Sequence, residues 1–106
     1  MGRKRMYKDI ELPKETVMCV KGLIAEAERQ RHERAMTDLG IKVQNAMDEA
    51  GKPLENRCRA LLVSDIAEGR GYDRSRMSLY MDIKTYYRRR RRYIYDVAIA
   101  MGLKYI

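Results

Sequence analysis

Aromatic residues other than tyrosine, and residues that break helices, are scarce in this chain. Among its 106 residues there is no Phe and no Trp, and there are only two Pro and seven Gly. So few breakers, with few alternations of β-branched and polar residues, argue against a β-rich fold and predict an all-α protein. Eight Tyr, eight Met and the aliphatic residues must then fill the interior. With an apolar content of 45%, we expect residues 1–106 to fold as a single small helical domain.

Metal ligands and catalytic groups are also scarce. Cys19 and Cys58 lie far apart and His32 is the single histidine, so no zinc-binding spacing is present. Both cysteines lie in apolar-periodic segments, which predicts buried, reduced thiols in a cytoplasmic protein. The sequence has no Gly-rich phosphate loop, no Cys–His pair at a readable spacing and no obvious carboxylate pair. We therefore expect no enzymatic activity, no cofactor and no metal.

Long apolar runs are missing as well. No segment approaches the length needed to span a bilayer, so no membrane partner is expected. The first residues, MGRKRMYKD, are charged and have no apolar run behind them, unlike a signal peptide. We expect residues 1–11 to form a solvated basic arm.

Positive charge is what the chain has in excess, and it is concentrated. The chain carries 23 Lys and Arg against 15 Asp and Glu, a net charge of +8. Residues 70–92 hold nine of the basic residues, with Asp73 and Asp82 as the acids among them. Five consecutive arginines, 88–92, repel one another along a helix unless an anion compensates them, and a duplex supplies anions along its whole length. The pattern therefore favours a nucleic-acid partner.

The stretch 82–102, DIKTYYRRRRRYIYDVAIAMG, predicts one helix with two different faces. Asp82 can cap its N-terminus, and Gly102 can adopt the left-handed conformation that ends helices. A helix in a DNA major groove needs one face anchored in protein and another that presents donors to bases and phosphates. The apolar face expected in the core consists of Tyr86, Tyr93, Val97 and Ala100, with Ile94 and Met101 beside them. The opposite face consists of Lys84, Arg88, Arg91 and Tyr95.

Five consecutive arginines cover every side of a helix, so one or two of them must approach the protein body. Arg90 lies close to the Tyr86–Tyr93 face and Arg89 borders it. We expect both to extend their stems across apolar surface or to pair with a carboxylate. The candidate carboxylates are Asp65, Glu68 and Asp73.

The N-terminal half of the chain also has helical periodicity. Residues 12–50, with Pro13 at the helix start, predict either one long helix or a helix pair broken near 30–40. Residues 26–34 have hardly any apolar side chain. We expect them to be largely exposed, or to lie in a mostly polar contact between subunits.

A second helical segment follows. Gly51-Lys52-Pro53 interrupts the periodic pattern, and Pro53 is expected to open a helix that Gly69 ends. Residues 70–81 are expected to form a short helix or a helical turn. The Arg-rich helix then begins after Asp82.

This order of elements resembles the helix-turn-helix end of the RinA-type phage transcriptional activators and the related sigma-factor region-four fold. LPKETVMCVKG (12–22) resembles the N-terminal helix of such regulators, and IKVQNAMDEAGKPLENRCRALLVSDIAEGRGYD (41–73) resembles their central helix pair. KTYYRRRRRYIYDVAIAMGL (84–103) resembles the recognition helix and its apolar tail. The resemblance implies a C-terminal helix-turn-helix unit over 53–103 that binds double-stranded DNA near a promoter. It also implies activation of phage or prophage genes through RNA polymerase.

The sequence thus predicts a sequence-specific, double-stranded DNA-binding transcriptional regulator that reads the major groove with helix 83–101. Side chains near the helix start that point away from the apolar face can reach base edges, and Arg92, to the side, is expected to meet a phosphate. The predicted DNA-binding residues are Lys84, Thr85, Tyr87, Arg88, Arg91, Arg92, Arg74 and Arg76.

Two other functions fit the same charge pattern. One is RNA binding, in which Tyr87 and Tyr95 could stack on bases. The other is a helical adaptor or anti-repressor that binds an acidic protein. A single small reading head touches only a short site, so we expect a homodimer if the protein acts alone, with residues 26–39 as its interface.

Overall fold

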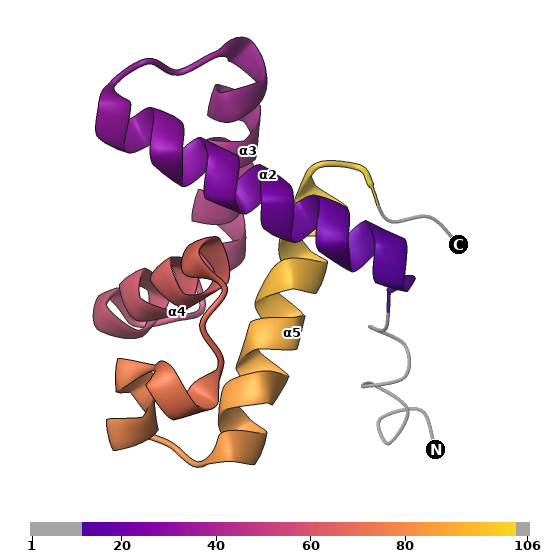
Figure 1. Cartoon of the computed structure of the whole chain (residues 1–106). Coiled ribbons are helices and arrows are strands. Elements are labelled where there is room, and N and C mark those ends of the chain that lie inside the picture. Colours follow the sequence, from indigo (N-terminus) through magenta and orange to yellow (C-terminus); the bar gives the residue numbers. More distant parts are fainter. Residues whose placement is uncertain (1–11, 104–106) are drawn as a thin grey trace.

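The computed structural model describes residues 12–103, so the basic arm predicted for 1–11 lies outside the described residues. Two short 3₁₀ helices connect the last two α-helices, and no strand occurs between residues 12 and 103. The predicted all-α fold is confirmed (Figure 1). The elements are α2 (Lys14–Glu33), α3 (Asp38–Gly51), α4 (Asn56–Glu68), η2 (Tyr72–Arg74), η3 (Arg76–Leu79) and α5 (Ile83–Ala100).

Of the two arrangements predicted for 12–50, the helix pair is the observed one. α2 ends at Arg34, whose φ of 56° is left-handed, and α3 begins after its N-cap residue Thr37. The Thr37 hydroxyl accepts a hydrogen bond from the Gly40 N–H (3.0 Å). The side-chain oxygen of Gln30 accepts from both the N–H and the hydroxyl of Thr37, at 2.9 and 3.1 Å. Local hydrogen bonds therefore fix the break between the two helices.

The C-terminal half of α2 is largely exposed, as predicted for residues 26–34. Arg29 pairs with Glu26 along the helix, and the hydrogen bond from Arg29 lowers the pKa of Glu26 to about 2. Ala27 and Gln30 are exceptions, because both are buried on the side of α2 that faces the core.

The prediction that Pro53 opens a helix is wrong. The Leu54 N–H donates to the Gly51 carbonyl at 3.0 Å, which closes a turn around Pro53. The extended Glu55 is the N-cap residue of α4, and its carbonyl accepts the first helical hydrogen bond, from the Arg59 N–H at 2.9 Å. The proline therefore belongs to the turn, and α4 starts three residues later than predicted.

The two predicted glycine stops are confirmed. Gly69 and Gly102 have φ values of 72° and 74°. After each of them a backbone N–H reaches back to a carbonyl five residues earlier: Arg70 to Asp65, and Leu103 to Ala98, both at 2.8 Å. This pattern satisfies carbonyls that would otherwise have no partner at a helix end.

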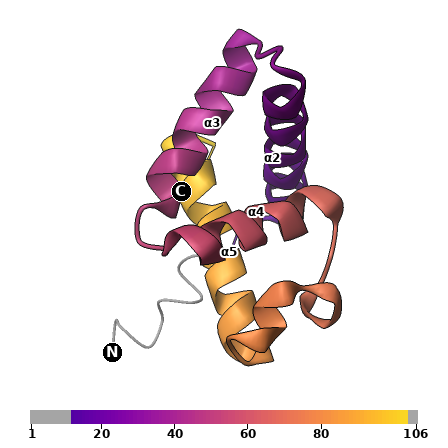
Figure 2. The ribbon, with the colours of Figure 1, turned by 90° about the vertical axis from the view of Figure 1, so that its left-hand side faces the viewer.

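All four α-helices contribute to a common apolar core. α2 and α3 form a hairpin, α4 packs across α2, and α5 packs against α3 and α2 (Figures 1 and 2). The central side chains, each with no more than 2% of its surface exposed, are Val20 and Ile24 of α2, Val43 and Met47 of α3, Leu62 of α4, Met77 of η3, and Tyr86, Tyr93 and Val97 of α5.

Two residues predicted in the core lie at the surface. Ala100 is exposed, and Ala98 is buried in its place, because the buried side of α5 is centred closer to Ile94 than the sequence pattern indicates. Cys19 is exposed, since it lies about 100° around α2 from the buried Val20. The burial predicted for Cys58 is confirmed.

The helix-turn-helix predicted over 53–103 is not confirmed. The short helix or helical turn expected over 70–81 is present as η2 and η3, which are 3₁₀ turns of three and four residues. α4 therefore does not meet α5 through a short turn, and residues 69–82 separate the two helices.

Candidate nucleic-acid interface

The start of α5 is fixed by a side-chain cap. Asp82 is the N-cap residue, and its carboxylate accepts a hydrogen bond from the Thr85 N–H at 3.4 Å. Hydrogen bonding from Thr85 holds the pKa of the Asp82 carboxyl below its ordinary value. The carboxylate is therefore charged at neutral pH. It caps a free N–H group of the first turn and so fixes where the basic helix begins.

One side of α5 presents the predicted cations to solvent. Lys84, Arg88 and Arg91 are exposed, and with Ile83 and Tyr87 they line an open hollow of about 610 Å³. The opposite side of the same helix is in the core, where Tyr86 and Tyr93 are at most 2% exposed. α5 therefore has one anchored face and one cationic face, as the sequence predicts.

Tyr87 and Thr85 are held closer to the body than the other predicted DNA-binding residues. The Tyr87 hydroxyl accepts a hydrogen bond from the Tyr72 N–H at 3.1 Å, and its ring meets that of Tyr86 edge-on at 4.9 Å. Thr85 is half-buried. The Tyr87 side chain thus links α5 to η2, and its hydroxyl already has a partner within the protein.

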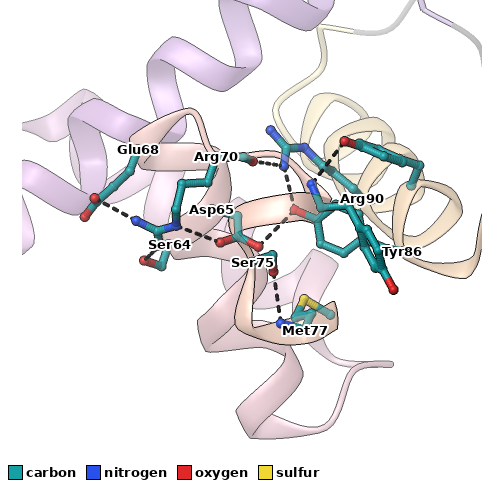
Figure 3. Close-up of polar contacts among 10 residues, drawn as sticks. Ser64, Asp65, Glu68, Arg70, Ser75, Met77, Tyr86 and Arg90 are labelled. Carbon is teal, nitrogen blue, oxygen red and sulfur yellow. Dashed lines mark hydrogen bonds and ion pairs between the residues drawn. The ribbon is translucent and has the colours of Figure 1, made fainter. Parts of the chain in front are cut away.

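Arg90 turns inward, as predicted, but its partners differ from those expected. One guanidinium nitrogen donates to the Arg70 carbonyl (2.5 Å) and to the Tyr86 hydroxyl (2.7 Å) (Figure 3). The Tyr86 hydroxyl in turn donates to Asp65 at 2.9 Å. Arg90 is therefore joined to a candidate carboxylate through a tyrosine, without direct contact.

Arg70 binds two of the carboxylates that were predicted as partners of Arg90. Its guanidinium donates to Asp65 (3.1 Å), Glu68 (2.8 Å) and Ser64 (2.6 Å) (Figure 3). Asp65 is 2% exposed, and Tyr86 beside it has its pKa raised by burial and by the hydrogen bond to this carboxylate. Two of the nine basic residues of 70–92, Arg70 and Arg90, therefore make hydrogen bonds within the protein body. In the sequence, the only indication of these interactions was Asp65, an acid at a core position of α4 directly before Ile66.

Arg89 borders the protein body but, unlike Arg90, remains exposed. Arg89 is exposed and lines a hollow of about 580 Å³ between the start of α4 and the residues before α5. Cys58 and Met81 line the same hollow.

The remaining predicted residues are exposed but differ in their partners. Arg92 forms an ion pair with Asp96, one turn further along α5, at 3.2 Å. Arg74 in η2 and Arg76 in η3 extend the exposed basic surface beyond the helix start. A phosphate at Arg92 must therefore compete with Asp96 for the guanidinium.

Two other features are absent from the part of the chain that the structure describes. No group of three or more His, Cys, Asp or Glu side chains gathers there, and none of the described helices is long and apolar enough to cross a membrane. Comparison with models of known protein families, with curated proteins and with solved structures gives no match.

Proposed function

We propose that this chain binds double-stranded DNA through the cationic face of α5 and acts as a sequence-specific transcriptional regulator of phage type. The observation that carries the proposal is the exposure of Lys84, Arg88 and Arg91 along one side of a helix whose other side is buried in the core. An α-helix fits the major groove of B-DNA, where arginine and lysine can reach base edges and the flanking phosphates.

The position of this face favours contact with a large partner. The start of α5 and the two 3₁₀ helices lie at the end of the molecule remote from the α2–α3 connection (Figure 1). A duplex could therefore approach the helix start without meeting that connection. Arg74 and Arg76 on the neighbouring turns could reach phosphates beside the groove.

The finer parts of the proposal rest on the resemblance to RinA-type activators. They comprise action near a promoter through RNA polymerase. The proposed homodimer rests instead on the short site that a single reading head can touch, and the cytoplasmic location on the expected reduced cysteines. Selection of bound duplexes from a random pool tests sequence preference and the dimer, because the half-site spacing of the selected sequences reports a dimer. Enrichment of single-stranded RNA over duplex DNA in a matched competition would overturn the DNA proposal in favour of RNA binding.

Alanine variants of Arg88 and Arg91 test the reading face. Each is expected to lose about 1–3 kcal/mol of discrimination between the selected duplex and a scrambled one, with an almost unchanged melting temperature. Lys42→Ala, which removes an exposed charge from α3, is the matched control and should retain the preference. Titrations against both duplexes measure the effect.

Two further arginines separate the roles along the helix. Arg92→Ala should weaken binding to all duplexes about equally, because a phosphate contact carries no sequence information. Arg90→Ala should lower the melting temperature and affect specificity only secondarily, since Arg90 is bonded to the Arg70 carbonyl and to Tyr86. If Arg90 proves to set specificity while Arg88 and Arg91 do not, the proposed reading face is wrong.

A further inference from the structure

A second hollow, of about 470 Å³, lies between α2 and α5, on the flank of the basic helix. Val17 and Lys21 of α2 form one wall, and Arg90, Arg91 and Ile94 of α5 form the other. Gly69, Arg70 and Gly71, which follow α4, line the hollow from a third side. Four cations from three parts of the fold therefore line one hollow, and no Asp or Glu of residues 12–103 is among its lining residues.

The four cations are not equivalent. Asp65 and Glu68 compensate the charge of Arg70, which lines the hollow from the side. Arg90 uses one nitrogen for its two hydrogen bonds, and its other N–H donors have no partner among residues 12–103. Lys21 is half-buried and Arg91 exposed, and neither forms an ion pair with a carboxylate of the described chain.

Three donors of the same sign around one space favour an anion with several acceptor oxygens. Phosphate is such an anion, since it accepts charge-assisted hydrogen bonds from arginine and lysine together. The hollow is larger than a phosphate alone, and Val17 and Ile94 give it an apolar part that could contact an attached sugar or base. The lining thus suits a phosphate ester better than a simple inorganic ion.

We propose that the hollow between α2 and α5 is a phosphate-binding site in which Lys21 and Arg90 hold the anion from opposite walls, with Arg91 at the edge that the hollow shares with the reading face of α5. The phosphate belongs either to the backbone of a nucleic acid or to a small phosphorylated compound. The site goes beyond the reading face of α5, because it brings in α2 through Lys21, which lies outside the basic block of 70–92.

Titration of the full chain with inorganic pyrophosphate, followed by the backbone amide resonances, tests the site. At constant ionic strength, saturable shifts are expected around residues 17–21 and 90–94. Lys21→Gln should weaken the binding about tenfold, because it removes one charge-assisted hydrogen bond. Lys21→Arg should restore most of it, and acetate at the same concentration should not reproduce the shifts.

Lys42→Gln is the matched control, because it removes an exposed lysine of α3 that does not line the hollow. Its pyrophosphate affinity should equal that of the unmodified chain. Shifts that do not saturate, or an equal loss in the Lys21 and Lys42 variants, would overturn the proposal and leave only non-specific attraction by net charge.

A competition arm distinguishes the two sources of phosphate. If pyrophosphate displaces the selected duplex, and does so less effectively from Lys21→Gln, the site takes a backbone phosphate. If duplex and pyrophosphate bind together, the site takes a separate phosphorylated compound. If the protein binds pyrophosphate at Lys21 but binds no duplex, the phosphate site is supported and the DNA-binding proposal is refuted. Failure of one proposal can therefore be distinguished from failure of the other.

Discussion

The Asp65 carboxylate is 2% exposed and accepts hydrogen bonds from Tyr86 and Arg70. Burial of a carboxylate is costly unless donors replace the water it loses. Here the donors come from α5 and from the segment after α4, and Arg90 extends the network back to the Arg70 carbonyl. This network fixes the position of the basic helix α5 relative to α4. It therefore affects binding of a partner to α5 by orienting the helix, not by contacting the partner.

We predict that Tyr86→Phe lowers the free energy of unfolding by about 1–3 kcal/mol, because the buried Asp65 loses a donor while the ring volume is kept. Urea unfolding measures the change. Tyr80→Phe is the control: Tyr80 is 54% exposed and its hydroxyl accepts from Arg57 at 3.3 Å, so a change under about 0.5 kcal/mol is expected. Equal effects of the two variants would mean that the network contributes no stability.

Tyr93 gives a second prediction, on pH. Burial raises the pKa of the Tyr93 hydroxyl above its ordinary value in the folded chain. The contribution of the protonated Tyr93 side chain to the free energy of unfolding is fully present below pH about 10, where the tyrosine of the unfolded chain also keeps its proton. Above that pH the unfolded state binds fewer protons than the folded state, so stability falls by about 1.4 kcal/mol per pH unit for this group.

The measurement is urea unfolding at a series of pH values from neutral to alkaline, on the unmodified chain and on Tyr93→Phe. The variant should show a shallower alkaline decline. At neutral pH its stability should change little, because the hydroxyl donates only a long 3.5 Å bond to the Met47 carbonyl. An unchanged alkaline slope in Tyr93→Phe would refute the assignment to this tyrosine.

At the scale of elements, the connection between α2 and α3 shows how local bonds override helix propensity. Gln30 is buried and accepts two hydrogen bonds from Thr37, and a Cβ on Gly40 would overlap the same Gln30 oxygen. In the sequence, Gly40 is only a residue that weakens a helix. In the structure it makes room for the side chain that ends one helix and aligns the next.

Two glycines inside helices provide a matched pair of variants. Gly22→Ala should raise the free energy of unfolding by about 0.5–1 kcal/mol, because nothing lies within 4 Å of the added Cβ and alanine favours the helix. Gly40→Ala should lower it by about 1 kcal/mol or more, because displacement of Gln30 breaks its bonds to Thr37. Urea unfolding of both variants checks the signs, and stabilisation by Gly40→Ala would contradict the role given to Gln30.

At the scale of the whole molecule, the charge is distributed unevenly over the fold. The polar half of α2 compensates its own charges through pairs such as Arg29 with Glu26 and Arg31 with Glu28. The basic block of 70–92 carries nine Lys and Arg against two Asp, and within residues 12–103 Arg70 and Arg92 form ion pairs with carboxylates. The net positive potential therefore concentrates around α5 and the turns before it.

If this surface binds phosphates, duplex affinity must depend steeply on salt. With roughly five phosphate contacts, the slope of log K against log salt concentration should be about −4 to −5. Binding to one duplex over a range of salt concentrations measures it, and Lys42→Ala should leave the slope unchanged. A slope shallower than about −2 would mean that the block does not dock on the backbone.

Local patterns were enough to predict the helical class, the cap at Asp82, the stops at Gly69 and Gly102, and the core positions Tyr86 and Tyr93. Each of these depends on the 3.6-residue period or on the conformational preference of a single residue, and both can be read from the sequence. The division of α5 into an apolar and a cationic face follows from the same period.

Tertiary structure alone determined which cations remain exposed and which turn inward. Arg70 and Arg90 turn inward because Asp65, Tyr86 and a backbone carbonyl offer partners there, whereas Arg89 lines a hollow beside the start of α4 and remains exposed. The period of a helix gives the direction of each side chain but not what faces it, since that depends on segments far away in the sequence. The hollow between Lys21 of α2 and Arg91 of α5 depends in the same way on the packing of two distant segments. It therefore cannot be predicted from the sequence of either helix alone.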